Sequence, residues 1–166
     1  MGTGLLLGWW VECVIGVLKL EIPRCHLPPV RSLRTGAKTE YSGPMKTVAI
    51  LGASNDRNKF GNKAVRAFLQ HGDRVWPVNP KETAVEGLPA FKTIAEVPGR
   101  PDLVSVYLPP PVLLKVLPDI ATRDCGELWL NPGTDSAEVI AAAEGLGLNV
   151  IRACSIVALG ISPATL

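Results

Sequence analysis

The residues best suited to do chemistry in this sequence are a small-residue loop and two cations that follow a short apolar run at 48–51. This loop carries its small and charged residues in the order Gly52, Ala53, Ser54, Arg57, Lys59 and Gly61. An uninterrupted apolar run is typical of a strand that is buried on both faces. A helix that follows such a strand directs its free amides and its positive dipole end at the loop, where phosphate oxygens bind well. The sequence therefore predicts a phosphate-binding loop between a strand at 47–51 and a helix at 62–71.

An ordinary strand-to-helix turn is the alternative for the same residues. In that case Ser54 or Asn62 caps the helix and the charged side chains are solvated. The spacing of the glycines in the loop argues against a dinucleotide ligand, because the compact G-x-G-x-x-G spacing of dinucleotide sites is absent. The next predicted strand ends at Val78 and leads to Asn79, not to the acidic residue that binds a nicotinamide ribose. Arg57 and Lys59 favour a ligand with more phosphate than a plain dinucleotide.

Five short apolar runs alternate with segments of helical periodicity, a pattern that predicts an α/β fold with a parallel sheet. The predicted strands are Thr47 to Leu51, Val75 to Val78, Leu103 to Leu108, Glu127 to Leu130 and Asn149 to Ile151. We expect a doubly wound, Rossmann-like sheet of five strands in the order 3-2-1-4-5. Right-handed crossovers then bring the loops after the strands to one edge of the sheet.

Two further loops are predicted at this edge. Pro109, Pro110 and Pro111 lack amide hydrogens, so the loop after the third strand is a stiff wall and not a phosphate site. The fourth strand leads to Pro132 and Gly133, whose backbone can approach a ligand closely. We expect residues 134–136, which follow, to cap the next helix.

The cysteines do not suggest catalysis or metal binding. Cys154 follows the last strand, but the sequence places no base near it, and we expect an inert thiol. We therefore predict no catalytic residue. The four cysteines, Cys13, Cys25, Cys125 and Cys154, lack paired metal-ligand spacing, and we predict no metal site. Without a credible secretion signal they fit a reducing cytoplasm.

The segments at 48–54, 78–80, 87–91, 102–111, 128–133 and 152–154 together carry a family resemblance. Over Met45 to Leu159 the sequence resembles the small CoA-binding proteins that correspond to the CoA-binding domain of the succinyl-CoA synthetase alpha subunit. The resemblance implies that CoA or acyl-CoA is the ligand. Its phosphates would lie near Gly52, Ala53, Ser54, Lys59 and Gly61, and its adenosine end near Arg74, Asn79 and Pro80. Pro109 would flank the adenine or the pantetheine arm, with Pro132 and Gly133 close by.

Three functions remain open. The first is a stand-alone CoA-binding or acyl-CoA-binding module without a complete catalytic apparatus. The second is the CoA-binding subunit of an ATP-dependent acyl-CoA synthetase whose ATP-binding partner is a separate chain. The third and least favoured is an NAD-type redox domain. A homodimer also remains open.

The charge distribution separates the first 44 residues from the rest. Residues 45–166 contain 12 Lys plus Arg and 12 Asp plus Glu, so the +2 net charge of the chain comes from residues 1–44. A nucleic-acid partner is not expected for a domain without basic excess. The apolar stretch from Gly4 to Leu18 is too short to span a membrane, and we expect no membrane partner. We expect residues 1–44 to be a disordered extension, or an artefact of a true start at Met45, with a weak interfacial anchor as the alternative.

Overall fold

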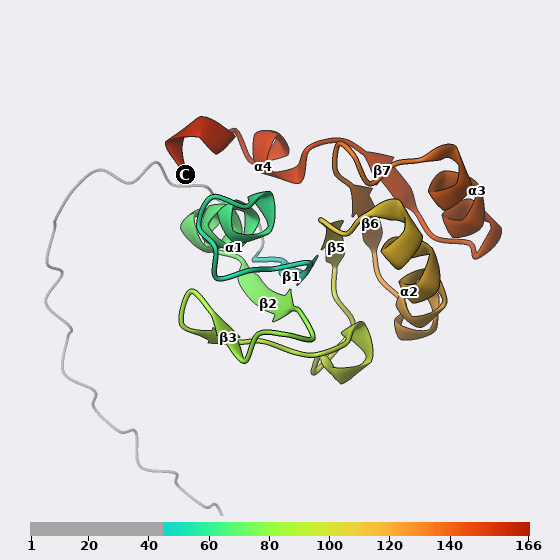
Figure 1. Ribbon diagram of the computed structural model, residues 1–166, viewed down its shortest axis with the longest axis horizontal. Coiled ribbons are helices and arrows are strands. Elements are labelled where there is room, and N and C mark those ends of the chain that lie inside the picture. The colour runs from blue at the N-terminus through green and yellow to red at the C-terminus, as the bar shows by residue number, and fades with distance from the viewer. Residues whose placement is uncertain (1–44) are drawn as a thin grey trace, which may run out of the picture. The chain divides into compact units, whose positions relative to one another are not determined.

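The computed structural model describes residues 45–166, and the predicted extension at 1–44 lies outside the described residues. The elements are, in chain order, β1 (Thr47–Leu51), α1 (Phe60–His71), β2 (Arg74–Val78), β3 (Ala84–Val85), β4 (Leu88–Pro89), the 3₁₀-helix η1 (Ile94–Glu96), β5 (Leu103–Val106), α2 (Pro110–Arg123), β6 (Glu127–Leu130), α3 (Ala137–Gly145), β7 (Val150–Arg152), α4 (Ser155–Ala158) and the 3₁₀-helix η2 (Pro163–Thr165) (Figure 1). None of the helices within residues 45–166 is long and apolar enough to cross a membrane.

The five long strands form one parallel sheet in the order β2-β1-β5-β6-β7, and β3 and β4 form a separate antiparallel hairpin. The predicted fold class, a doubly wound parallel sheet of five strands, is confirmed. The predicted order 3-2-1-4-5 is wrong in one respect. The third long strand, β5, pairs with β1 and does not pair with β2.

The chain itself explains why β2 lies at the edge of the sheet. Pro77 stands inside β2 and has no amide hydrogen, a residue that sheets accept mainly in edge strands. The outer side of β2 is then occupied by an extended segment at Phe91. The amide of Phe91 donates to the carbonyl of Pro77 over 2.9 Å, and the amide of Asn79 donates to the carbonyl of Phe91 over 2.9 Å. No position beside β2 is left for β5.

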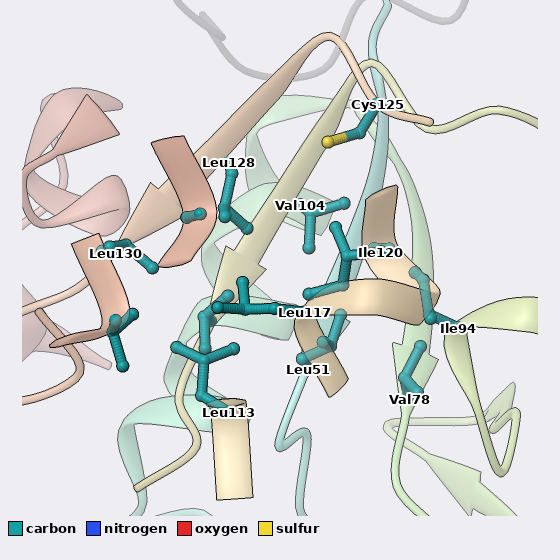
Figure 2. Close-up of a cluster of buried hydrophobic side chains, with 14 of the residues drawn as sticks. Leu51, Val78, Ile94, Val104, Leu113, Leu117, Ile120, Cys125, Leu128 and Leu130 are labelled. Carbon is teal, nitrogen blue, oxygen red and sulfur yellow. The ribbon is translucent and has the colours of Figure 1, made fainter. Parts of the chain in front are cut away.

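Two helices cover each face of the sheet, since successive strand residues point to opposite sides. Val48 and Ile50 of β1 pack in one cluster with α1 and with Ile156 of α4. Leu51 packs in the other cluster, with α2, α3 and residues of β5 and β6, as Figure 2 shows. Both faces of β1 are therefore buried, as its uninterrupted apolar run predicts.

The start of α1 lies directly against the end of β1. A β-carbon on Gly61 would collide with the carbonyl oxygen of Gly52, so only glycine permits this approach. Gly52 itself has a φ of +86°, and a β-carbon there would lie 2.8 Å from the carbonyl oxygen of Tyr107. These two glycines allow β1, α1 and the loop after β5 to meet at one point.

Candidate ligand-binding site

The carboxyl ends of the parallel strands meet at one edge of the sheet, and the chain reverses its direction of winding between β1 and β5. From β1 the chain crosses to β2 on one side, and from β2 it crosses back to β5 on the other. The loops after β1 and β5 therefore diverge, and ligands of doubly wound proteins bind in the crevice formed there. This is the position of the cavities in this structure.

Two cavities open at this edge, and both are lined by Gly52, Lys59 and Leu108. The first, which we call the lysine cavity, has a volume of about 500 Å³. The residues that complete it are Leu51, Val78, Asn79, Pro80, Lys81, Lys92, Thr93, Ile94, Val112, Val116 and Asp119. The second, which we call the proline cavity, has a volume of about 600 Å³. The residues that complete it are Phe60, Gly61, Tyr107, Pro109, Pro110, Asn131, Pro132, Gly133, Thr134 and Cys154.

Three cations from three different loops converge on the lysine cavity. Lys59 precedes α1, Lys81 follows β2, and Lys92 follows β4. Within residues 45–166 none of these lysines forms an ion pair, whereas the lining contains one carboxylate, that of Asp119. The cavity therefore offers an excess of positive charge to a ligand.

The main chain at the start of α1 adds to this electrostatic preference. The residue before the helix is Lys59, and its side chain forms no capping hydrogen bond. The amides of Phe60 and Gly61, in the first turn, have no partner within the helix. Both residues line the proline cavity. The free amides and the positive dipole end of α1 thus face the border between the two cavities.

Ser54 and Asn62 do not cap α1, so the ordinary capped turn is not what the structure contains. The side-chain amide of Asn62 is fully buried and donates to the carbonyl of Ser54 over 2.8 Å. The hydroxyl of Ser54 accepts from the amide of Asp56 over 3.1 Å. Both side chains thus hold the loop in shape.

The β3–β4 hairpin supports this loop from outside. The side-chain amide of Asn55 donates to the carboxylate of Glu82 over 2.6 Å and to the carbonyl of Ala84 over 2.8 Å. Glu86 accepts from the side-chain amide of Asn62 over 2.9 Å and pairs with Arg57 at 3.6 Å. Arg57 lines neither cavity, and its charge is directed to the hairpin.

Most of the predicted site residues lie together at this edge. Those that line a cavity are Gly52, Lys59, Gly61, Asn79, Pro80, Pro109, Pro132 and Gly133. Ala53 and Ser54 are buried and line neither cavity. The amide of Gly52 is already used, because it donates to the carbonyl of Val78 over 3.0 Å. Gly52 therefore has no free amide to donate to a phosphate.

The structure does not bring Arg74 to the site. Arg74 is the first residue of β2 and pairs in register with Thr47, the first residue of β1. The loop at Asn79 follows the other end of the strand, roughly 13 Å away at 3.3 Å per residue. The sequence prediction placed Arg74 near the nucleotide, whereas the structure places it away from both cavities, because the amino end of a parallel strand lies at the opposite edge of the sheet from the carboxyl end.

The sequence prediction missed two residues of the lysine cavity and the polar base of the proline cavity. Lys81 and Lys92 follow Pro80 and Phe91 directly, and their proximity to Lys59 depends on the loops after β2 and β4. A signal was present at Lys81, since a lysine in the loop after a parallel strand, at the carboxyl edge of the sheet, is a candidate phosphate ligand. Lys92 follows the β3–β4 hairpin and has no such signal.

Asn131 forms the centre of a buried hydrogen-bond network beneath the proline cavity. Its side-chain amide donates to the hydroxyl of Ser105 and to the carbonyl of Val106, each over 2.9 Å. Its side-chain oxygen accepts from the amide of Ser155 over 2.9 Å. The hydroxyls of Tyr107 and Ser155 lie 2.9 Å apart, and burial raises the pKa of Tyr107 to about 12. These polar groups are paired with one another.

The cavities contain few groups for bond-making chemistry. Cys154 lines the proline cavity and is partly buried, but none of the described lining residues is a histidine. Within residues 45–166 there is also no cluster of three or more His, Cys, Asp or Glu residues that could hold a metal ion.

The helix-capping prediction for 134–136 is confirmed, because the hydroxyl of Ser136 accepts from the amide of Val139 over 3.3 Å.

Comparison with known proteins adds the family. Residues 46–160 match the family model that is described as the CoA binding domain. The chain belongs to this family. Of curated relatives, the alpha subunit of ADP-forming acetate–CoA ligase II from Pyrococcus furiosus is 29% identical over 123 residues, which cover 68% of this chain and 27% of the relative. The chain thus spans about a quarter of the length of that ligase subunit.

Two solved structures have this family's fold and a similar size. A conserved hypothetical protein from Pyrococcus furiosus is 30% identical, with a TM-score of 0.64 over 69% of this chain and 99% of that one. A protein from Thermus thermophilus is 31% identical, with a TM-score of 0.63 over 68% of this chain and 87% of that one. The matched part of this chain therefore accounts for nearly all of at least one solved chain.

Proposed function

We propose that this chain binds CoA or acyl-CoA as a stand-alone module, with no complete catalytic apparatus of its own. The observation that carries the proposal is the convergence of Lys59, Lys81 and Lys92 on one cavity at the carboxyl edge of the sheet. CoA has a diphosphate and a 3'-phosphate at one end. A lysine ammonium group binds phosphate as a point charge, and three of them can serve three phosphate groups.

The different character of the two cavities supports one orientation of the ligand. The lysine cavity holds an excess of cations, whereas Lys59 is the one charged side chain among the described residues that line the proline cavity. The phosphates and the adenosine therefore belong in the lysine cavity. The neutral pantetheine arm belongs in the proline cavity, past the shared wall of Gly52, Lys59 and Leu108.

The solved Pyrococcus furiosus protein supports the stand-alone part of the proposal, because 99% of its chain is covered by this domain. The alternative is the CoA-binding subunit of an ATP-dependent acyl-CoA synthetase. The ADP-forming ligase subunit favours it, since this region forms 27% of that protein. An NAD-type redox domain is the least favoured, because β2 leads to Asn79, Pro80 and Lys81 where a ribose diol needs a carboxylate.

Calorimetric titration of lysine variants with CoA tests the proposal. We expect Lys59→Ala, Lys81→Ala and Lys92→Ala each to weaken CoA binding by about tenfold, since a hydrogen bond to a charged group contributes about 1.5 kcal/mol. Each variant should also show a weaker dependence of affinity on salt. Lys115→Ala is the matched control, because Lys115 is exposed on α2 and lines neither cavity. Equal CoA affinity in all four variants and the unmodified chain would contradict the phosphate role.

Addition of ATP and candidate ATP-binding chains separates the two leading functions. A stand-alone binding module gives no thioester product with any of them. ATP-dependent formation of a CoA thioester with one partner would establish the synthetase subunit instead.

A further inference from the structure

We propose that the proline cavity selects an apolar, uncharged acyl group on the CoA thioester over an acyl group that ends in a carboxylate. This inference rests on the proposed function, because it concerns the acyl group of the same ligand. With the phosphates in the lysine cavity, the thioester end of the ligand lies in the proline cavity. The lining of that cavity then decides which acyl groups are accepted.

Apolar groups dominate the walls of the proline cavity. Pro109, Pro110 and Pro132 contribute rigid rings, and Leu108 and Phe60 contribute larger apolar side chains. Phe60 is 55% exposed in the free protein, so an acyl group that covers its ring removes apolar surface from water. Burial of one methylene group favours binding by about fourfold.

Apart from Lys59 and the amides at the start of α1, which the phosphates engage in the proposed orientation, the polar groups of the lining have no spare donor for a carboxylate. Both hydrogens of the Asn131 side-chain amide are used, by Ser105 and by the carbonyl of Val106. The hydroxyl of Thr134 donates to the carbonyl of Asn131 over 2.8 Å, and the hydroxyl of Tyr107 is paired with that of Ser155. A carboxylate at the end of the acyl group, beside these paired groups, would lose water without gaining hydrogen bonds, which is strongly unfavourable.

A fixed negative charge lies just outside the cavity. The carboxylate of Asp135 accepts from the amide of Gly133, a lining residue, over 3.3 Å. Asp135 also pairs with Arg152 at 3.7 Å, so this cation is already held by a carboxylate. Arg152 is not among the described lining residues. Asp135 therefore repels an anionic acyl group and restrains Arg152.

Calorimetric titration of the full chain with CoA, hexanoyl-CoA and succinyl-CoA tests the inference. We expect hexanoyl-CoA to bind at least tenfold tighter than CoA, and succinyl-CoA to bind no tighter than CoA. Equal binding of CoA and hexanoyl-CoA, or tighter binding of succinyl-CoA than of hexanoyl-CoA, would overturn the acyl preference alone. If none of the three ligands binds, the proposed function fails as well, so the two failures are distinguishable.

The Asp135→Asn variant tests the electrostatic part of the inference. It removes the negative charge and releases Arg152, so succinyl-CoA should bind at least threefold tighter than it does to the unmodified chain, with hexanoyl-CoA unchanged. Glu138→Gln is the matched control, because it removes the same charge from an exposed residue in the first turn of α3. An equal gain for succinyl-CoA in both variants would contradict a local role of Asp135.

Discussion

The side-chain amide of Asn79 donates a hydrogen bond to the main-chain carbonyl of Ala53 over 2.6 Å and so joins the loop after β2 to the loop after β1. The side-chain oxygen of Asn79 accepts from the amide of Lys81 over 2.9 Å. One side chain therefore sets the positions of two loops that contribute lysines to the same cavity.

Replacement of Asn79 by Asp should uncouple these loops. A carboxylate has no hydrogen to donate to the carbonyl of Ala53, so the two oxygens repel each other. We expect a loss of about 1–3 kcal/mol in the free energy of unfolding, measured by urea denaturation. CoA affinity should fall together with stability. A variant with unchanged stability and affinity would show that Asn79 does not position the loops.

Gly61→Ala should destabilise the fold through the contact with Gly52. The added β-carbon meets the carbonyl of Gly52, and backbone cannot move away as the end of a side chain can. We expect the free energy of unfolding to fall by about 1–3 kcal/mol, which is the typical cost of forcing an extra methylene group into a packed core. Gly145→Ala is the matched control, since no heavy atom lies within 4 Å of a β-carbon there. Equal midpoints of urea unfolding for the two variants would contradict the close approach of α1 to β1.

The network at Asn131 predicts a large effect for a small change. Asn131→Ala leaves the buried amide of Ser155 without its side-chain acceptor, whereas the hydroxyl of Ser105 keeps its hydrogen bond to the hydroxyl of Ser155. An unsatisfied buried group costs about 1–3 kcal/mol, so we expect the free energy of unfolding in urea to fall by about that amount. Asn149→Ala provides the comparison, because the hydrogen bond from Asn149 to the carbonyl of Gly126 is exposed. A similar loss in both variants would argue against the network.

Two buried groups that lose a proton at high pH, the thiol of Cys125 and the phenol of Tyr107, predict a loss of stability at alkaline pH. Burial raises the pKa of Cys125 from 9.0 to about 11, with a smaller contribution from the negative charge of Asp124. Burial likewise raises the pKa of Tyr107 from 10.0 to about 12. The unfolded chain loses these protons first, so their contribution to stability is complete below pH 9 and falls as the pH rises from 9 to 12.

Thermal unfolding of Cys125→Ala and Tyr107→Phe between pH 8 and pH 12 checks this assignment. Relative to the unmodified chain, Cys125→Ala should have a flatter decline of Tm between pH 9 and pH 11. Tyr107→Phe should have a flatter decline between pH 10 and pH 12. Parallel curves for all three proteins would mean that neither group has a raised pKa in the folded state.

The fold class could be predicted from the sequence because it depends on local patterns. The run at Val48–Leu51 is buried on both faces, and the alternation of strands with helices fixes a parallel sheet. The order of the strands in the sheet was predicted wrongly because the apolar pattern does not show which strand lies at an edge. Pro77 in β2 is the local sign of an edge strand, and it excludes the predicted central position.

The candidate site could be predicted only in part, because its residues come from loops far apart in the sequence. The first loop was found through Gly52, Lys59 and Gly61, which are close together along the chain. Lys92 joins Lys59 only through the loop after β4, which no short sequence pattern predicts. Arg74 was grouped with Asn79 through the family resemblance alone, although the whole of β2 separates the two residues.

Titration of the full chain with CoA, dephospho-CoA and NAD tests the central claim most directly. Three convergent lysines predict that CoA binds about tenfold tighter than dephospho-CoA, because dephospho-CoA lacks the 3'-phosphate that one of these lysines would bind. NAD, with two phosphates and no acidic residue to receive its ribose, should bind more weakly than CoA. Binding of NAD in preference to CoA, or no binding of CoA, would contradict the proposed function.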